Sequence, residues 1–286
     1  MVSFAGQFIQ FCQGVSVTSR LRLAPTPSGL LHLGNALNFT LNWLAAKAVE
    51  TDLSSSAAAL LLRVDDLDTD RKRPAYVRDL FETLEWLKLD WDGPAIYQSD
   101  RLSSYFEVLD RLRASDLLFA CKKSRKDLEP FEGGYPPEFR EQNLSLDAPD
   151  VAWRIKTPPG FPLPDFVVRR REGIPAYQVA SFADDLNLGM THIIRGADLA
   201  DSTAAQCYLA SVLSEDKFLK IKLLHHPLIL GETGEKLSKS AGSESLSAWR
   251  RANRGPEKVF QTVGQLLDLE GDSAHALLES LRLRLV

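Results

Sequence analysis

Residues 20–35 read RLRLAPTPSGLLHLGN, and this stretch decides the fold. Leucine and arginine alternate over residues 20–24, which predicts a short strand. Two prolines follow, and each lacks a backbone N–H donor, so the strand must end before Pro25. Gly29 allows the chain to turn. From Leu33 onward apolar residues recur every three or four positions, which predicts a helix.

A strand, a tight turn and a helix in this order form the phosphate-binding corner of a nucleotide-binding fold, because the first turn of the helix presents N–H groups to an anion. His32 stands at the helix entrance, and Gly34 leaves room for a nucleotide to approach the backbone. An apolar run at residues 60–64 suits a buried parallel strand. The sequence therefore predicts an α/β protein with a Rossmann-type, doubly wound parallel sheet.

Composition narrows the class of protein further. A formal net charge of −4 over 286 residues gives no overall basic surface, so any RNA contact requires a local basic cluster. Lys122, Lys123, Arg125 and Lys126 form one such cluster. Three cysteines far apart in the sequence predict no disulfide framework. The first 19 residues lack both a basic start and an unbroken apolar run, so we expect neither a signal peptide nor a membrane span. The separated cysteines suit a reducing cytosol, and we expect a cytoplasmic monomer.

The predicted strand at 60–64 is followed by DDLDTD, residues 65–70. Its alternating acidic residues suggest a calcium loop. However, the position that requires glycine holds Arg71, and the position that requires glutamate holds Val77. We therefore reject a calcium site.

Two separate motifs carry a family resemblance. Residues 22–35 resemble the HIGH signature of class I aminoacyl-tRNA synthetases, in the form typical of glutamyl-tRNA synthetases. Residues 235–240, EKLSKS, resemble the second signature of the class, KMSKS. The two motifs occur in the family order, although Asn35 replaces the second histidine of HIGH. The resemblance implies activation of an amino acid by ATP, with Mg²⁺ bound to the nucleotide.

The resemblance also implies roles for individual residues. It assigns catalysis to His32, Lys236 and Lys239. ATP binding is assigned to Pro25, His32, Gly34, Asn35, Lys236, Leu237, Ser238 and Lys239. Glutamate binding is assigned to Arg22, Ala24, Thr26, Asp65, Tyr177 and Arg195.

The chemistry of glutamate requires such a set independently. The substrate has two carboxylates and one ammonium group, so its pocket needs cationic donors and one anion. The planar fork of arginine suits carboxylates, and Arg22 and Arg195 supply it. Asp65 supplies the anion, at a position where the family's RIEDTD segment has glutamate.

Residues 119–168 are dense in proline and glycine, which predicts an insertion between the two halves of the nucleotide fold. In the family this insertion meets the tRNA. Cys121 and Tyr135 match a zinc-binding pattern of glutamyl-queuosine tRNA(Asp) synthetases, C-x-C…Y-x3-C, but Lys123 and Phe139 occupy its other two positions. Structural zinc takes four ligands, so we expect no structural zinc.

The expected organisation has five segments. They are an N-terminal extension over 1–19, the first half of the nucleotide fold over 20–118, the insertion over 119–168, the second half over 169–242, and a short helical region over 243–286. Only 46 of the 286 residues follow Ser240, enough for two or three helices, whereas full-length glutamyl-tRNA synthetases carry a large anticodon-binding region there. This architecture resembles glutamyl-queuosine tRNA(Asp) synthetases, which attach glutamate to the queuosine base of tRNA(Asp). We expect the same reaction with L-glutamate, ATP and queuosine-containing tRNA(Asp).

Three alternatives stay open. The nearest is a truncated glutamyl-tRNA synthetase that charges a tRNA 3′ end. Another is a small-molecule nucleotidylyltransferase of the HxGH type, against which Asn35 and the Tyr177 and Arg195 positions argue. The last is a catalytically idle binding module, against which the intact His32 and Lys239 argue.

Overall fold

The computed structural model describes residues 2–49, 58–68, 73–131, 134–229 and 244–285. The chain separates into two compact units, each assembled from segments that are far apart in the sequence. The first unit contains Met1–Asp100, Met190–Leu199 and Ile221–Val286, and the second contains Arg101–Gly189 and Ala200–Lys220.

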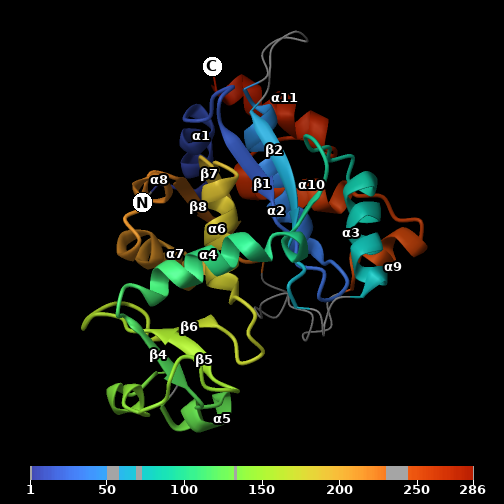
Figure 1. The fold of residues 1–286 in the computed structure, drawn as a ribbon. Coiled ribbons are helices and arrows are strands. Elements are labelled where there is room, and N and C mark those ends of the chain that lie inside the picture. Colours follow the sequence, from blue (N-terminus) through green and yellow to red (C-terminus); the bar gives the residue numbers. More distant parts are fainter. Residues whose placement is uncertain (1, 50–57, 69–72, 132–133, 230–243, 286) are drawn as a thin grey trace. The chain divides into compact units, whose positions relative to one another are not determined.

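Parallel strands form the centre of the first unit (Figure 1). β1 (Arg20–Leu23), β2 (Ala59–Val64) and β3 (Ile96–Tyr97) pair in that order, all in parallel. β7 (His192–Gly196) pairs in parallel with β8 (Lys222–His226). The Thr191 N–H donates to the Arg20 carbonyl at 3.0 Å, so β7 begins beside β1. The predicted mixed α/β architecture with a parallel sheet is confirmed.

The helix that follows the first signature covers this sheet. α2 (Leu33–Lys47) packs against β1, β2 and β7. Leu37, Leu41 and Leu44 are fully buried on the predicted apolar stripe. The side-chain amides of Asn38 and Asn42 donate to the Ile194 carbonyl at 3.2 and 3.1 Å. The helix is therefore fixed to β7 as well as to the strand that precedes it.

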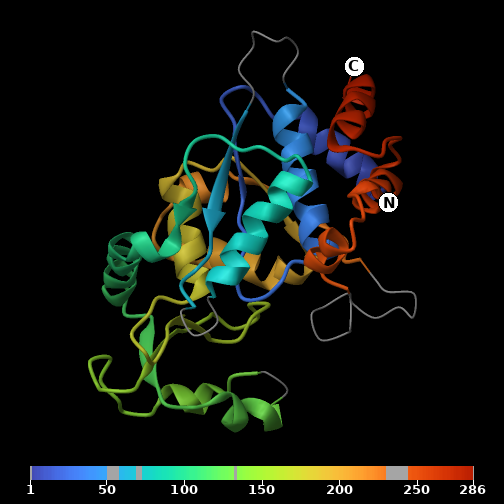
Figure 2. The ribbon, with the colours of Figure 1, turned by 90° about the vertical axis from the view of Figure 1, so that its right-hand side faces the viewer.

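Helices from both ends of the chain complete the first unit. α1 (Phe4–Gln13) packs against α10 (Glu257–Leu267) and α11 (Ala274–Leu285), and both of these contact α2 (Figure 2). Residues 4–13, expected to be part of a short extension, thus form a helix whose Phe8 is fully buried. α3 (Pro74–Trp86) contacts α9 (Leu246–Arg251). In the described part of the chain, no helix combines the length and apolar character needed to cross a membrane.

The second unit combines an antiparallel sheet with helices. β4 (Leu118–Cys121), β5 (Ala152–Ile155) and β6 (Phe166–Arg169) pair in that order. The buried Asp184 of α6 (Tyr177–Asn187) accepts from Arg101 Nε at 2.6 Å and from the Tyr105 hydroxyl at 2.8 Å, which ties α4 (Leu102–Arg113) to α6. The other elements of this unit are α5 (Arg125–Leu128), η2 (Glu129–Phe131), η3 (Pro137–Arg140), α7 (Ala200–Val212) and α8 (Asp216–Leu219). The short elements η1 (Gln98–Asp100) and η4 (Ala197–Leu199) belong to the first unit.

Candidate active site

The carboxyl ends of the parallel strands carry the expected substrate-binding residues. Arg22 in β1 is 4% exposed, Asp65 directly after β2 is 5% exposed, and Arg195 in β7 is 3% exposed. In open α/β sheets ligands bind outside these strand ends. The first unit therefore brings two guanidinium groups and one carboxylate to the edge of the sheet where a ligand is expected.

The turn after β1 lies against the end of β2. The Asp65 N–H donates to the Pro25 carbonyl at 2.9 Å, and the Ser28 N–H donates to the Thr26 carbonyl at 2.9 Å. Ala24 is half-buried, whereas Thr26 is exposed. Pro25 thus positions the turn through its carbonyl, next to the carboxylate expected to bind the substrate's ammonium group.

His32 caps the N-terminus of α2. Its Nδ1 accepts the Gly34 N–H at 3.2 Å, and its own N–H donates to Asn35 Oδ1 at 3.0 Å, which completes a capping box. Because Nδ1 is an acceptor, the proton of the neutral ring is on Nε2. The sequence pattern could place His32 at a helix entrance, but only the structure places the Gly34 N–H at Nδ1, which assigns the N–H of the neutral ring to Nε2, beside the positive end of a helix dipole.

The structure explains the glycine at position 34 by a close contact that the sequence did not suggest. A Cβ at this position would lie 3.1 Å from His32 Cε1 and 3.2 Å from His32 Nδ1, tighter than ordinary contacts. Glycine thus lets the imidazole lie across the first turn of α2. The expected close approach of a nucleotide to Gly34 and Asn35 stays a prediction.

The backbone N–H and carbonyl of Leu31, the residue before His32, both form hydrogen bonds to distant helices. The Leu31 N–H donates to Asp79 Oδ2 at 3.1 Å, and the Leu31 carbonyl accepts the Leu246 N–H at 2.9 Å. Asp79 Oδ1 in turn accepts from Arg250 Nη2 at 2.7 Å. We call this arrangement the Leu31 clamp. It joins the turn of the first signature to α3 and to α9, the helix that follows the second signature in the sequence.

Sequence reasoning missed the Leu31 clamp, although one signal was present. Asp79 precedes the fully buried Leu80 in α3, and it is 4% exposed. A buried carboxylate requires a charged or hydrogen-bonded partner. Its partners, Leu31 and Arg250, are 48 and 171 residues away in the sequence, so the pattern alone could not identify them.

Asp65 is oriented by Arg63, a residue of the strand that precedes it. Arg63, fully buried, donates from Nε to Asp65 Oδ1 at 2.6 Å and from Nη2 to Asp65 Oδ2 at 3.0 Å. A two-point contact of this kind fixes the plane of the carboxylate. Asp66 faces other partners, the N–H and the hydroxyl of Ser99, each at 2.8 Å. The two acidic residues thus have separate structural anchors.

The histidines near Arg195 in the sheet, His192 and His226, contact groups of the protein interior. His192 packs edge-on against Phe11 with ring centroids 5.2 Å apart, and its Nδ1 lies 2.8 Å from the Thr191 hydroxyl. His226 Nδ1 lies 2.9 Å from the Pro227 carbonyl. Burial lowers the pKa of both imidazoles below the ordinary histidine value. The surroundings of His192 are thus those of a structural residue.

The remaining expected residues are not part of this assembly of described residues. Tyr177 opens α6 in the second unit, so its partnership with Arg195 stays a prediction. Lys236, Leu237, Ser238 and Lys239 lie outside the described residues. The flanks of that segment are β8, which ends at His226, and α9, which begins at Leu246.

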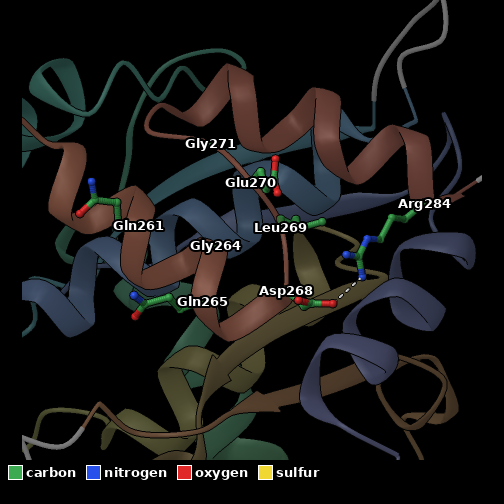
Figure 3. A pocket seen from close by; sticks show the side chains of 8 residues that line it. All are labelled: Gln261, Gly264, Gln265, Asp268, Leu269, Glu270, Gly271 and Arg284. Atoms are coloured by element: carbon green, nitrogen blue, oxygen red, sulfur yellow. Dashed lines mark hydrogen bonds and ion pairs between the residues drawn. The ribbon is translucent and has the colours of Figure 1, made fainter.

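A hollow in the first unit is distinct from these residues (Figure 3). It has a volume of about 460 Å³ between α10 and α11, and the Arg284–Asp268 ion pair, 3.0 Å long, lies on its wall. No residue that lines it belongs to the expected ATP or glutamate site. The lining consists of Gln261, Gly264, Gln265, Asp268, Leu269, Glu270, Gly271 and Arg284.

Comparison with known proteins places the chain in a family. The model of the family described as "tRNA synthetases class I (E and Q), catalytic domain" matches residues 18–134 and 140–278. The chain belongs to this family. Members of class I use ATP, which accords with the phosphate-binding type of turn at the N-terminus of α2.

The sequences of individual relatives align with most of this class I synthetase. A glutamyl-Q tRNA(Asp) synthetase of Pseudomonas fluorescens is 40% identical over 243 residues, which cover 79% of this chain and 78% of the relative. One of Synechococcus sp. is 36% identical over 265 residues, covering 89% and 85%. The structure of a glutamate tRNA ligase from Elizabethkingia meningosepticum, in complex with its amino acid, superposes with a TM-score of 0.71 at 23% identity. The match covers 93% of this chain but 65% of that ligase, and it shows the fold.

Proposed function

We propose that this class I synthetase activates L-glutamate with ATP and transfers the glutamyl group to the queuosine base of tRNA(Asp). One observation carries the proposal. The glutamyl-Q tRNA(Asp) synthetases of Pseudomonas fluorescens and Synechococcus sp. are 40% and 36% identical to this chain over most of its length. The placement of Arg22, Asp65 and Arg195 at the strand ends supports it, because these groups suit an amino acid with two carboxylates.

In the activation step, a carboxylate oxygen of glutamate attacks the α-phosphorus of ATP. A bond from oxygen to the α-phosphorus forms, the bond to the bridging oxygen breaks, and pyrophosphate leaves with its electron pair. His32 donates from Nε2 to a phosphate oxygen at the N-terminus of α2. Lys236 and Lys239 place positive charge where charge develops on the leaving group. Magnesium would enter with the ATP and would neutralise part of the charge of its phosphates.

The amino-acid pocket uses the groups at the sheet edge. Arg22 and Arg195 bind the substrate carboxylates, and Asp65, held by the Arg63 fork, binds the ammonium group. Tyr177 contributes a hydroxyl, while Ala24 and Thr26 line the pocket. Asp65 is one methylene shorter than glutamate, so the ammonium group must lie correspondingly closer to the end of β2.

The transfer step requires the anticodon loop of the tRNA at this site. A hydroxyl of the queuosine diol attacks the carbonyl carbon of the glutamyl adenylate, the carbon–oxygen bond to phosphate breaks, and AMP leaves. In the second unit Lys122 and Lys126 are exposed beside the half-buried Lys123. With Arg125, they supply a basic cluster for the phosphates of the anticodon stem. We expect the protein to act as a monomer in the cytoplasm.

The acceptor is tested by transfer of radiolabelled glutamate. The substrates are queuosine-containing tRNA(Asp), the same tRNA with guanine in place of queuosine, and glutamate tRNA. Each is used intact and after removal of its 3′-terminal adenosine, which carries the competing ribose diol. We expect label only on the queuosine-containing tRNA(Asp), with or without its terminal adenosine. Label only on intact glutamate tRNA would instead show a truncated enzyme that charges a 3′ end.

A further inference from the structure

Four side chains at the positions of the zinc pattern converge in the second unit. The Tyr135 hydroxyl oxygen lies 3.1 Å from Cys121 Sγ. The rings of Tyr135 and Phe139 meet edge to face with centroids 5.8 Å apart, and Lys123 Nζ lies 4.4 Å from the centre of the Phe139 ring. The Lys123 N–H donates to Cys121 Sγ at 3.3 Å, which closes a ring of contacts. The four residues that align with the zinc pattern, Cys121, Lys123, Tyr135 and Phe139, therefore also lie next to one another in the structure.

These residues do not fit a zinc ion. Zinc in structural sites is bound by four ligands, mostly thiolates and imidazoles. Here the four positions hold one thiol, one phenol, an ammonium group and a phenyl ring. The ammonium group of Lys123 repels a cation, and the phenyl ring of Phe139 has no ligand atom. Among the described residues, no group of three or more histidine, cysteine, aspartate or glutamate side chains could hold a metal ion.

Gln142, which lies outside the zinc pattern, connects the members of this ring. Its Nε2 donates to the Tyr135 hydroxyl oxygen at 3.1 Å and to the Phe139 carbonyl at 2.6 Å. Its Oε1 accepts the Lys122 N–H at 3.0 Å. One amide side chain thus bridges the residue after β4, the buried tyrosine and the 3₁₀ turn η3.

The same contacts determine where the tyrosine proton goes. The Tyr135 hydroxyl lies 3.1 Å from both Cys121 Sγ and the Phe139 carbonyl, but it has a single proton. A carbonyl oxygen can accept two hydrogen bonds, so the Phe139 carbonyl accepts from Gln142 and also shares the hydroxyl proton with the sulfur. Cys121 Sγ accepts from the Tyr135 hydroxyl and from the Lys123 N–H.

Electrostatics agrees with this assignment of donors. Burial acts to raise the pKa of the Cys121 thiol, but hydrogen bonds from Tyr135, Gln142 and the Lys123 backbone, with the charge of Arg154, bring it below the ordinary cysteine value. Burial, together with the hydrogen bond to Cys121, raises the pKa of Tyr135 above its ordinary range. The phenol thus remains the donor and the sulfur the acceptor.

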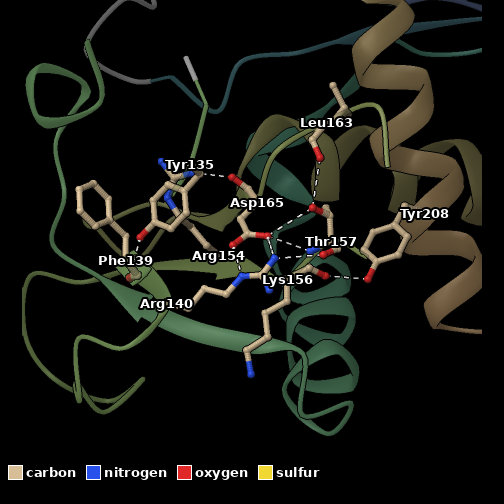
Figure 4. A network of polar contacts seen from close by, with 9 residues as sticks. All are labelled: Tyr135, Phe139, Arg140, Arg154, Lys156, Thr157, Leu163, Asp165 and Tyr208. Atoms are coloured by element: carbon tan, nitrogen blue, oxygen red, sulfur yellow. Dashed lines mark hydrogen bonds and ion pairs between the residues drawn. The ribbon is translucent and has the colours of Figure 1, made fainter. Parts of the chain in front are cut away.

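The ring of contacts is also joined to the sheet of the second unit (Figure 4). The Arg154 guanidinium stacks 4.4 Å from the centre of the Tyr135 ring and donates to the Asp165 carbonyl at 2.7 Å. The Asp165 carboxylate accepts from Arg140 Nε and Nη2, both at 2.6 Å, and from the Thr157 N–H at 2.9 Å. The segment around Tyr135 is thereby connected to β5 and to the loop before β6.

We infer that Cys121, Tyr135 and Gln142 form a metal-free tie that holds the insertion at the place where the family's pattern binds zinc. The sulfur is the acceptor at its centre, and the Gln142 amide is the donor that joins its two ends. The tie fixes the segment that begins with the exposed Lys122 and the half-buried Lys123.

The first test removes the donors of the tie without changing its shape. Gln142→Glu keeps the size of the side chain, deletes both N–H donors and brings a carboxylate beside the sulfur. Gln261→Glu, on the exposed face of α10, is the matched control. We expect the melting temperature to fall by roughly 4–8 °C for Gln142→Glu only, with faster hydrogen exchange in peptides covering residues 118–142. An effect no larger than that of the control would overturn the tie.

The second test measures the zinc content of the protein directly. The purified wild-type protein should contain no stoichiometric zinc, and a chelator should leave its melting temperature unchanged. The double variant Lys123→Cys and Phe139→Cys, in reducing buffer, should bind one zinc per chain and should tolerate Gln142→Glu when zinc is bound. Stoichiometric zinc in the wild type, or none in the double variant, would contradict the inference.

Discussion

The turn between β1 and α2 and the part of the insertion between β4 and β5 are both connections between regular elements, and hydrogen bonds hold each of them. In the turn, the backbone N–H of Leu31 is held by Asp79 from α3 and its carbonyl by Leu246 from α9. In the insertion, the tie around Cys121 is built from residues between 121 and 142. The turn depends on helices distant in the sequence, whereas the insertion holds itself together locally. Damage to the first should impair activation of glutamate, and damage to the second should impair transfer alone.

The largest effect is expected at Lys239. Lys239→Ala should reduce glutamate-dependent ATP–pyrophosphate exchange by at least about a hundredfold, because removal of one preorganised charge-stabilising donor costs a factor of about 10²–10³. The matched control is Lys126→Ala in the insertion, which should leave exchange unchanged and weaken transfer to tRNA. Circular dichroism checks that both variants are folded. Equal loss of exchange in the two variants would contradict the assignment of activation to the signature motifs and of tRNA binding to the insertion.

Arg195→Ala should give the next largest effect. Loss of a charge-assisted hydrogen bond to a substrate carboxylate should raise the KM for glutamate by roughly 10–100-fold and change the KM for ATP little. Arg195→Lys retains the charge but loses the fork, so it should lie between the wild type and the alanine variant. Parallel losses for both ligands would indicate a wrong role or a misfolded protein.

The Leu31 clamp offers a sharper comparison, since two carboxylates contact the same arginine. Arg250 Nη2 lies 2.7 Å from Asp79 Oδ1 and 3.0 Å from Glu82 Oε2, but Asp79 is the one that also accepts the Leu31 N–H. Asp79→Asn should lower kcat of exchange by roughly 3–10-fold, because a small misplacement of His32 suffices for such a loss. Glu82→Gln should change it little. If both variants behave alike, the ion pair with Arg250 matters and the hold on Leu31 does not.

The smallest effect is expected from mild acid. Burial holds the pKa of His192 and of His226 below the unfolded value of about 6.5. The unfolded chain therefore binds protons that the folded chain does not, so the stability that these residues contribute is present above about pH 6.5 and declines below it. All five histidines lie in segments of the first unit. Between pH 7 and 5, hydrogen exchange should accelerate in β7 and β8 more than in β4 and β5.

A matched variant tests the origin of that pH effect. His226→Gln keeps a polar side chain of similar reach and cannot titrate. Its melting temperature should fall less between pH 7 and 5 than that of the wild type. An unchanged or steeper fall would mean that other groups cause the acid sensitivity.

The core of the fold could be predicted because its signals are local. Proline and glycine after Ala24 mark the end of β1, and the leucines of 33–47 recur at helical spacing. The same kind of signal was present for α1, where Phe4, Phe8 and Phe11 share a face, but interrupting Gln and Gly residues concealed it. The strands of the second unit have four residues each, too few to show a period.

The parts of the site that escaped prediction are single polar residues with distant partners. Asp79 and Gln142 belong to no motif, and each acts only because folding brings a backbone group to it. The tautomer of His32 likewise follows from the position of the Gly34 N–H, not from the sequence. Conversely, the zinc pattern was recognised from the two matching residues Cys121 and Tyr135. The structure shows that the residues at its other two positions contact each other, with Lys123 Nζ 4.4 Å from the centre of the Phe139 ring.

The most direct measurement is ATP–pyrophosphate exchange in the absence of tRNA, run with each of the twenty amino acids. The purified chain should catalyse exchange with L-glutamate alone, because Arg22, Arg195 and Asp65 suit two carboxylates and one ammonium group, and because the proposed activation step does not involve the acceptor. Exchange with glutamine or aspartate instead of glutamate, or no exchange until a tRNA is added, would contradict this account.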